Sequence, residues 1–131
     1  MKGSLNHIEI YVKDLNRTRE FWGWLLGEMG YTKYQEWACG ISYLHEPSRI
    51  YIVFVQAEER FLDIEYHRCR AGLNHLAFYG GSREFIDRIT AKLRKRGVNI
   101  LYEDKHPFAG GPDYYAVFFE DPDRMKVEIT A

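Results

Sequence analysis

The chain of 131 residues contains little cysteine, because only Cys39 and Cys69 are present and they form neither a C-x-x-C pair nor a disulfide framework. This composition favours a reducing, cytoplasmic compartment. The sequence also lacks a long apolar run. Its longest candidate, residues 50–55, has the length of a strand and is too short to span a bilayer. The first four residues lack the apolar segment of a signal peptide. We therefore expect a cytoplasmic protein with no membrane partner.

The sequence has no excess of charge of either sign. Lysine and arginine total 18, aspartate and glutamate total 19, and the formal net charge is −1. There is thus no electrostatic reason to expect a nucleic acid or an anionic membrane as partner. Aromatic residues make up 16% of the chain, which suits a small core as well as a ligand site. The length favours one domain and is sufficient to bury a hydrophobic core.

The chain repeats itself. Leu-Asn-His-Ile at residues 5–8 returns as Leu-Asn-His-Leu at residues 73–76, an offset of 68 positions. Near the end of each copy, residues 48–54 match residues 123–129 with an offset of 75. The seven additional residues belong inside the second copy. The loop 104–113, which contains two prolines and two glycines, is the obvious place for them, because loops absorb insertions at low cost.

Each copy predicts a strand, a helix and three further strands. The helices are indicated by apolar residues at three-to-four-residue spacing, with Asp14 or Asn16 as the first N-cap and Ser82 as the second. Gly30 and Gly97 are natural helix ends. The strands after the helices are expected at residues 34–37, 40–44 and 49–55, and at 99–102, 114–119 and 125–130.

The predicted fold class is therefore α+β: two tandem βαβββ modules that pair into a curved sheet with the helices outside. We expect residues 1–131 to form a single domain. Within it, module one spans residues 1–60, a charged connector spans 61–71, and module two spans 72–131.

Three residues are candidates for one divalent metal site. His7 and His75 occupy the same position of the same strand in the two modules, and a pseudo-twofold axis would bring them together. Glu128 lies on the last strand, where an unpaired buried carboxylate would be costly. Two imidazoles and one carboxylate leave coordination positions open for substrate, which is typical of catalytic sites. The alternative is ordinary strand histidines, with Glu128 turned to solvent by strand alternation.

Four stretches resemble the vicinal-oxygen-chelate superfamily, which includes glyoxalase I, type I extradiol dioxygenases, fosfomycin-resistance thiol transferases and bleomycin-resistance proteins. Residues 5–12 and 73–78 look like the two strands that carry the metal histidines. Residues 21–31 look like the family's "FY…LG…G" helix end, and residues 119–129 look like its "DPDG…E" close. The four stretches stand in the family's order, at matching places in the repeat.

The sequence departs from the family pattern at two positions. Arg124 stands where glycine is usual, which changes a turn and removes no ligand. Val53, the repeat equivalent of Glu128, stands where glyoxalase I carries a fourth ligand, a glutamate. In ligand count the chain resembles the dioxygenases and the fosfomycin enzymes instead.

The resemblance implies a glyoxalase-like enzyme that uses Fe, Mn, Zn or Ni to activate a small substrate with vicinal oxygens. The reaction would be of the lyase or isomerase, thiol transferase or dioxygenase type, and the chain would form a homodimer. The alternative is non-catalytic binding of a small molecule or antibiotic, as in bleomycin-resistance proteins. Tyr43, Val53 and Tyr115 are candidate substrate contacts, and Tyr114 or Tyr115 is a candidate acid–base residue. Core packing is the alternative for these tyrosines, and the catalytic residues are not assigned.

Overall fold

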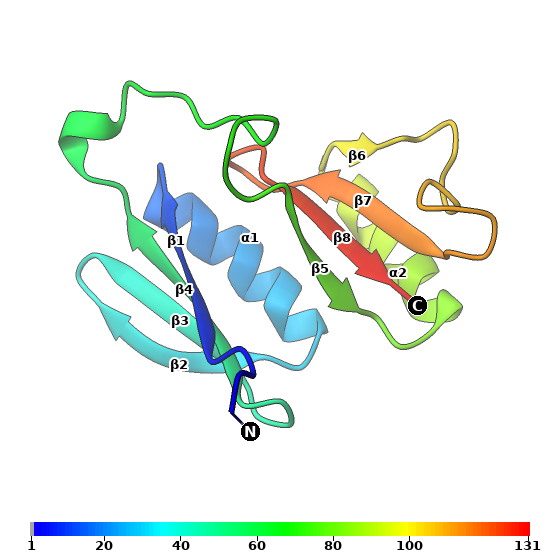
Figure 1. Cartoon of the computed structure of the whole chain (residues 1–131), viewed down its shortest axis with the longest axis horizontal. Helices are drawn as coiled ribbons and strands as arrows, with labels where there is room; N and C mark the ends of the chain where they lie inside the picture. The colour runs from blue at the N-terminus through cyan, green and yellow to red at the C-terminus, as the bar shows by residue number, and fades with distance from the viewer. Residues whose placement is uncertain (1) are drawn as a thin grey trace. The chain divides into compact units, whose positions relative to one another are not determined.

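The computed structural model describes residues 2–131, and the chain divides into two compact units with a boundary between Glu65 and Tyr66. This boundary falls inside the predicted connector. The first unit contains β1 (His7–Val12), α1 (Leu15–Glu28), β2 (Thr32–Trp37), β3 (Gly40–His45), β4 (Ile50–Gln56) and the short 3₁₀ helix Glu59–Phe61. The second contains β5 (His75–Tyr79), α2 (Arg83–Lys95), β6 (Ile100–Leu101), β7 (Ala116–Glu120) and β8 (Lys126–Thr130) (Figure 1).

Each unit is one four-stranded sheet with one helix, so the predicted α+β class and βαβββ order are confirmed. The strand orders are β1-β4-β3-β2 and β5-β8-β7-β6. In each sheet the first and last strands of the unit pair in parallel, and the other pairs are antiparallel. The intervening helix provides the crossover that a parallel pair requires.

The helices begin and end where the capping pattern predicts. The side chain of Asp14 accepts a hydrogen bond from the amide of Arg17, and that of Ser82 accepts one from the amide of Phe85. Asp14, and not Asn16, is therefore the first N-cap. Gly30 and Gly97 follow the helices with φ of 85° and 74°, the left-handed conformation that glycine adopts without steric cost.

One face of each sheet packs on its helix and forms the core of the unit. In the first unit Trp22 is fully buried and its ring centroid lies 5.1 Å from that of Phe54 on β4. In the second unit Ile86 and Leu93 are fully buried, as are Val127 and Ile129 of β8. Burial of each such side chain contributes about 1.5–3 kcal/mol. The opposite sheet face is left available for polar groups.

The two units also share an unusual turn before their last strand. Arg49 has φ of 61° and Arg124 has φ of 64°, so both adopt the left-handed conformation. These are the residues that the sequence repeat aligns with an offset of 75. The glycine expected from the family pattern at position 124 is thus replaced by an arginine that keeps a glycine-like backbone.

The largest difference between the units lies between the second and third strands. Residues 38–39 join β2 to β3, whereas residues 102–115 join β6 to β7, which places the predicted insertion. The strands expected at 99–102 and 114–119 are shorter than predicted. Tyr114 and Tyr115 stand in the loop, because the amide of Tyr114 donates to the carbonyl of Gly111 in a turn.

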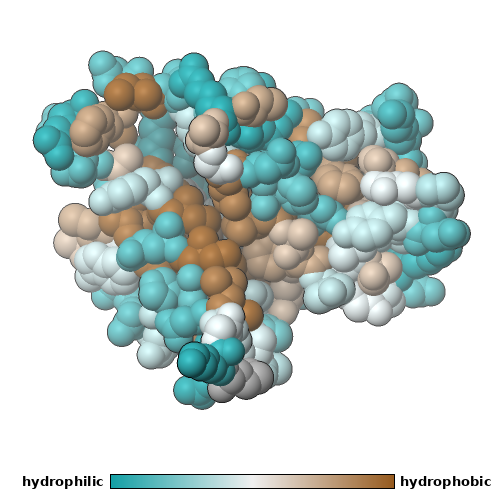
Figure 2. Space-filling view, viewed as in Figure 1, coloured by the Kyte–Doolittle hydropathy of each residue, from teal (hydrophilic) through white to brown (hydrophobic). Residues whose placement is uncertain are grey.

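Among residues 2–131, no helix combines the length and the apolar character that crossing a membrane requires. Apolar surface is nevertheless visible on the first unit in the space-filling view, over β1 and its neighbours (Figure 2). Cys39 and Cys69 are both exposed and free.

Candidate metal and substrate site

The sheet of the second unit presents His75 and Glu128 on one face. The parallel register pairs His75 with Lys126 and Ala77 with Glu128. Because side chains alternate along a strand, His75, Ala77 and Glu128 share the sheet face that α2 does not cover. Glu128 is 4% exposed, which excludes the alternative in which strand alternation turns it to solvent. A buried carboxylate requires partners, since its charge is costly away from water.

His75 is the first partner of this carboxylate. Its Nε2 lies 3.0 Å from Glu128 Oε2, and its Nδ1 lies 2.7 Å from the side-chain oxygen of Asn74. Because an amide oxygen only accepts, Nδ1 carries the proton that is donated to Asn74. Nε2 is then the nitrogen with a lone pair, and it is aimed at a carboxylate oxygen.

Tyr114 is the second partner. Its hydroxyl donates a hydrogen bond to Oε1 of Glu128, the oxygen that does not face His75. This hydrogen bond, with burial as a smaller contribution, raises the pKa of Tyr114 above its usual value. The phenol therefore remains a donor at neutral pH, and both oxygens of the buried carboxylate are oriented.

The arrangement fits a divalent metal. A lone pair on Nε2 and an anionic oxygen 3.0 Å apart require a positive charge between them, either a proton or a metal ion. Two cis ligands of a six-coordinate ion, each about 2.1 Å from it, also stand about 3.0 Å apart. The orienting hydrogen bond from Nδ1 is the second contact that metal-bound histidines usually make.

His7 repeats this arrangement in the first unit. Its Nδ1 lies 2.7 Å from the side-chain oxygen of Asn6, so its Nε2 is likewise free to act as a ligand. The imidazole is exposed and stacks on Tyr51 at 4.7 Å with an interplanar angle of 11°. Within neither unit do three His, Cys, Asp or Glu side chains of residues 2–131 gather as a metal site. The three-ligand set that adds His7 to His75 and Glu128 stays a prediction.

The first unit carries its carboxylate on a different strand. Val53 of β4, the equivalent of Glu128, is 5% exposed and pairs with Glu9 of β1. Glu9 is the equivalent of Ala77 by the offset of 68. The second unit therefore has alanine on its first strand and glutamate on its last, whereas the first unit has glutamate on its first strand and valine on its last. Glu9 is exposed on the same side of β1 as His7.

The candidate substrate contacts differ in position. Tyr43 is 6% exposed and packs against α1, with its ring 6.3 Å from that of Phe54, and burial raises its pKa. This position favours the packing alternative for Tyr43. Val53 lies on the sheet face away from α1, beside Ser42 of β3 in the register.

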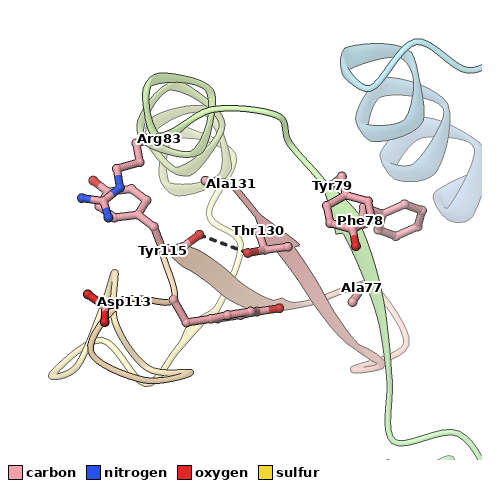
Figure 3. A pocket seen from close by; sticks show the side chains of 9 residues that line it. Ala77, Phe78, Tyr79, Arg83, Asp113, Tyr115, Thr130 and Ala131 are labelled. Carbon is pink, nitrogen blue, oxygen red and sulfur yellow. Dashed lines mark hydrogen bonds between the residues drawn. The ribbon is translucent and has the colours of Figure 1, made fainter.

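Tyr115 contributes to a pocket of about 500 Å³ on the second unit. The pocket is bounded by the ends of β5 and β8, the start of α2 and the loop before β7, and its lining residues are Ala77, Phe78, Tyr79, Arg83, Asp113, Tyr114, Tyr115, Thr130 and Ala131. In Figure 3, Arg83, Asp113 and Tyr115 stand on one side of the cavity, and Phe78 and Tyr79 stand on the other. Tyr114 joins the pocket to Glu128, because it lines the one and donates to the other.

Sequence reasoning missed three polar residues of this region. Arg83 looks like a solvated charge in the first turn of a helix, and Asp113 looks like a loop charge. Lys126, in register with His75, lies 3.2 Å from the Tyr102 hydroxyl through its Nζ. The repeat could have placed Lys126 on the ligand face, because it precedes Glu128 by two residues on a strand.

The sequence of the chain matches a known family. A sequence model of the Glyoxalase/Bleomycin resistance protein/Dioxygenase superfamily matches residues 4–129. The chain is 57% identical over 127 residues to the uncharacterized protein YqjT of Bacillus subtilis (strain 168), and the match covers 97% of this chain and 98% of the relative.

Solved structures are similar as well. The crystal structure of a candidate glyoxalase from Bacillus halodurans has a TM-score of 0.96 and 58% identity, and the match covers 99% of this chain and 96% of that chain. The fosfomycin resistance protein FosX from Listeria monocytogenes has a TM-score of 0.71 and 25% identity, with coverage of 100% and 94%. Another FosX crystal structure, at 24% identity and a TM-score of 0.68, contains Mn(II) and 1S,2S-dihydroxypropylphosphonic acid and shares the fold.

Proposed function

Because the chain belongs to the Glyoxalase/Bleomycin resistance protein/Dioxygenase superfamily, we propose that it is a metal-dependent enzyme acting on a small substrate with two neighbouring oxygens. His75 and Glu128 would hold a divalent Fe, Mn, Zn or Ni ion, and His7 would be the third ligand, from the same chain or from a second copy. When bound, such an ion supplies a Lewis acid that polarises the substrate oxygens. The presence of Mn(II) in FosX supports a divalent ion within this fold.

The observation that carries the proposal is the contact between His75 Nε2 and Glu128 Oε2, together with the Asn–His pair that recurs in both units. In the neutral imidazole, the side-chain oxygens of Asn6 and Asn74 favour the Nδ1–H tautomer at both equivalent positions, which leaves Nε2 for a ligand.

The remaining groups have roles that do not involve the metal directly. Tyr114 holds the carboxylate of Glu128 and extends its ring into the pocket, where it can contact substrate. The three reaction types open to the site are isomerisation, thiol addition and ring-opening oxygenation. We also propose that the chain is cytoplasmic and forms a homodimer. Light scattering of the purified chain would test the dimer.

Metal analysis is the decisive experiment. The chain is purified without chelator or affinity-tag metal, and its metals are measured by elemental mass spectrometry before and after reconstitution. We expect near-stoichiometric metal, lost in His7→Ala, His75→Ala and Glu128→Ala. His67→Ala is the matched control, because the Nδ1 of His67 only accepts the amide of Cys69 in the connector.

The identity of the metal would order the activity assays. Iron would direct them to catechols with dioxygen, whereas Mn, Ni or Zn would direct them to epoxides with thiols and to thiohemiacetals. A chain that neither retains metal nor takes it up would contradict the enzyme proposal. The favoured function would then be non-catalytic binding of a small molecule, of the bleomycin-resistance type, for which the tyrosine-lined pocket is suited.

A further inference from the structure

The pocket beside Tyr114 contains a charged group that the proposed metal site does not use. Arg83, the first residue of α2, lines this pocket together with three tyrosines. We propose that the pocket binds a small organic anion with a flat, unsaturated or aromatic body, whose oxyanion pairs with the guanidinium of Arg83. If the bound anion is the substrate, the inference rests on the proposed function. Binding of an anion by the pocket does not depend on that function.

Arg83 lacks the acidic partner that its helix would normally supply. Asp87 lies four residues further along α2, where an ion pair with Arg83 would be expected. Instead, Asp87 Oδ1 accepts a hydrogen bond of 2.6 Å from the hydroxyl of Tyr115. Across residues 2–131, no aspartate or glutamate forms an ion pair with Arg83. The positive charge is therefore available to a ligand.

The guanidinium is also held in place by aromatic rings. Its central carbon lies 4.9 Å from the ring centroid of Tyr115 and 5.9 Å from that of Phe108. These two rings meet edge to face at 5.4 Å and 88°. A cation–π contact uses no N–H acceptor, so the N–H groups of the guanidinium remain able to pair with a carboxylate in a bidentate manner. The cation is thus oriented before a ligand binds.

The other walls define the rest of the ligand. Tyr79, 89% exposed, stands across the cavity from Arg83 and offers its ring to a flat group, whereas the ring of Phe78 points away from the cavity (Figure 3). Asp113 lies on the same side as Arg83, so it disfavours a polyanion and favours a ligand with a hydroxyl or amine donor. The volume of about 500 Å³ is in the range of small-molecule sites.

The pocket also adjoins the candidate metal ligands. Ala77 lines it and pairs in register with Glu128, and Tyr114 lines it and donates to Glu128. An anion on Arg83 would therefore extend its body towards the pair formed by His75 and Glu128. An acid that carries its two neighbouring oxygens at the end of its body remote from the carboxylate has this shape.

Mandelate is a suitable probe, because it combines one carboxylate, one hydroxyl and one aromatic ring. It would be titrated into the ¹⁵N-labelled full chain, with mandelamide as the neutral counterpart. We expect amide shifts that cluster at residues 77–83, 113–115 and 130–131. Arg83→Gln should weaken mandelate binding by at least about tenfold, to the level of mandelamide. Arg88→Gln is the matched control, since Arg88 lies on α2 against Phe85 and does not line the pocket.

Equal binding of mandelate by the parent chain and Arg83→Gln would overturn the inference, as would shifts outside the pocket or no binding. The same titration in His75→Ala separates this inference from the metal proposal. Binding that depends on Arg83 and survives in a metal-free His75→Ala chain would support the anion pocket even if no metal is ever found. Metal binding without binding dependent on Arg83 would sustain the enzyme proposal and reject this ligand class.

Discussion

The hydroxyl of Tyr114 donates to Oε1 of Glu128, whose other oxygen lies 3.0 Å from His75 Nε2. A loop residue thus orients a carboxylate that is buried in the last strand. Substitution of Tyr114 therefore tests the support of the carboxylate while the candidate metal ligands His75 and Glu128 are kept.

Tyr114→Phe should lower metal affinity by about 10–100-fold, because the carboxylate loses the donor that orients it. Titration of the metal-free chain with Mn(II) or Zn(II) would measure the effect. Tyr115→Phe is the control, since its hydroxyl bonds to Asp87 and should leave metal affinity unchanged. Equal affinity in Tyr114→Phe and the parent chain would argue that the Glu128 carboxylate needs no such support.

Asn74→Ala should also lower metal affinity, by about 10–100-fold, because His75 would lose the acceptor that fixes its tautomer. Asn74→Asp should retain the affinity, since a carboxylate accepts from Nδ1 equally well. Asn16→Ala serves as a control, as Asn16 is bonded to Arg19 on α1. Loss of affinity in the alanine and aspartate variants alike would show that Asn74 acts through something other than this hydrogen bond.

Gly110→Ala should reproduce the effect of Tyr114→Phe. A Cβ at Gly110 would overlap the ring of Tyr114, whereas one at Gly27 would meet nothing. We expect the alanine to displace the ring and weaken metal binding, and the double variant with Tyr114→Phe should be no weaker than either single variant. Gly27→Ala, in the last turn of α1, should leave metal affinity unchanged and stabilise the helix by at most about 0.5–1 kcal/mol. Additive losses in the double variant would exclude this route.

Arg49→Gly should raise the free energy of unfolding by about 0.5–1 kcal/mol, because glycine relieves the left-handed backbone at φ of 61°. The ion pair that is lost, with Glu46, is exposed and contributes little. Arg124→Gly should not be stabilising, since Arg124 Nε lies 2.9 Å from Oε2 of the buried Glu120. Urea unfolding curves with unchanged slopes would provide both values, and a gain of equal size in both variants would contradict the argument.

His106 should make the fold sensitive to mild acid. Burial, with the charge of Arg94 as a smaller contribution, lowers the pKa of His106 below its ordinary value of 6.5. The folded chain then resists protonation that the unfolded chain accepts, so stability is lost as the pH falls from about 6.5 through the folded pKa.

NMR titration of His106 and urea unfolding at about pH 7.5 and 5.5, on either side of the ordinary histidine pKa, would check this prediction. His106→Gln should lose less stability than the parent chain over that interval. Arg94→Gln should move the pKa of His106 back towards its ordinary value. A pKa of His106 at or above 6.5 in the parent chain would be incompatible with burial as the dominant cause.

Most of the fold could be predicted because the repeat supplies two independent readings of each element. Asp14 and Ser82 cap their helices, and Gly30 and Gly97 follow them, because these signals are local. Residues 99–102 and 114–119 were harder, since tyrosine favours strands by propensity alone. In the structure the hydroxyls of Tyr114 and Tyr115 bond to side chains outside any strand pairing.

The candidate site divides in the same way. The contact between His75 and Glu128 follows from the strand register, which the repeat encodes. The proposed role of Arg83 could not be predicted from the strand register. It depends on the conformation of residues 102–115 and on the hydrogen bond that Asp87 accepts from Tyr115. The three-ligand set with His7 stays a prediction. This set combines residues of both units, and the sequence relates the units only by the internal repeat.

The loop 102–115 gives the second unit a replaceable part. Strands β5, β7 and β8 form the framework that carries His75 and Glu128, while the loop contributes Asp113, Tyr114 and Tyr115 to the pocket. Changes in this segment that keep Tyr114 and Gly110 would alter ligand preference while the contact that orients the Glu128 carboxylate is retained. Ligand specificity can therefore be varied in a library confined to a single surface loop, on strands that stay unchanged.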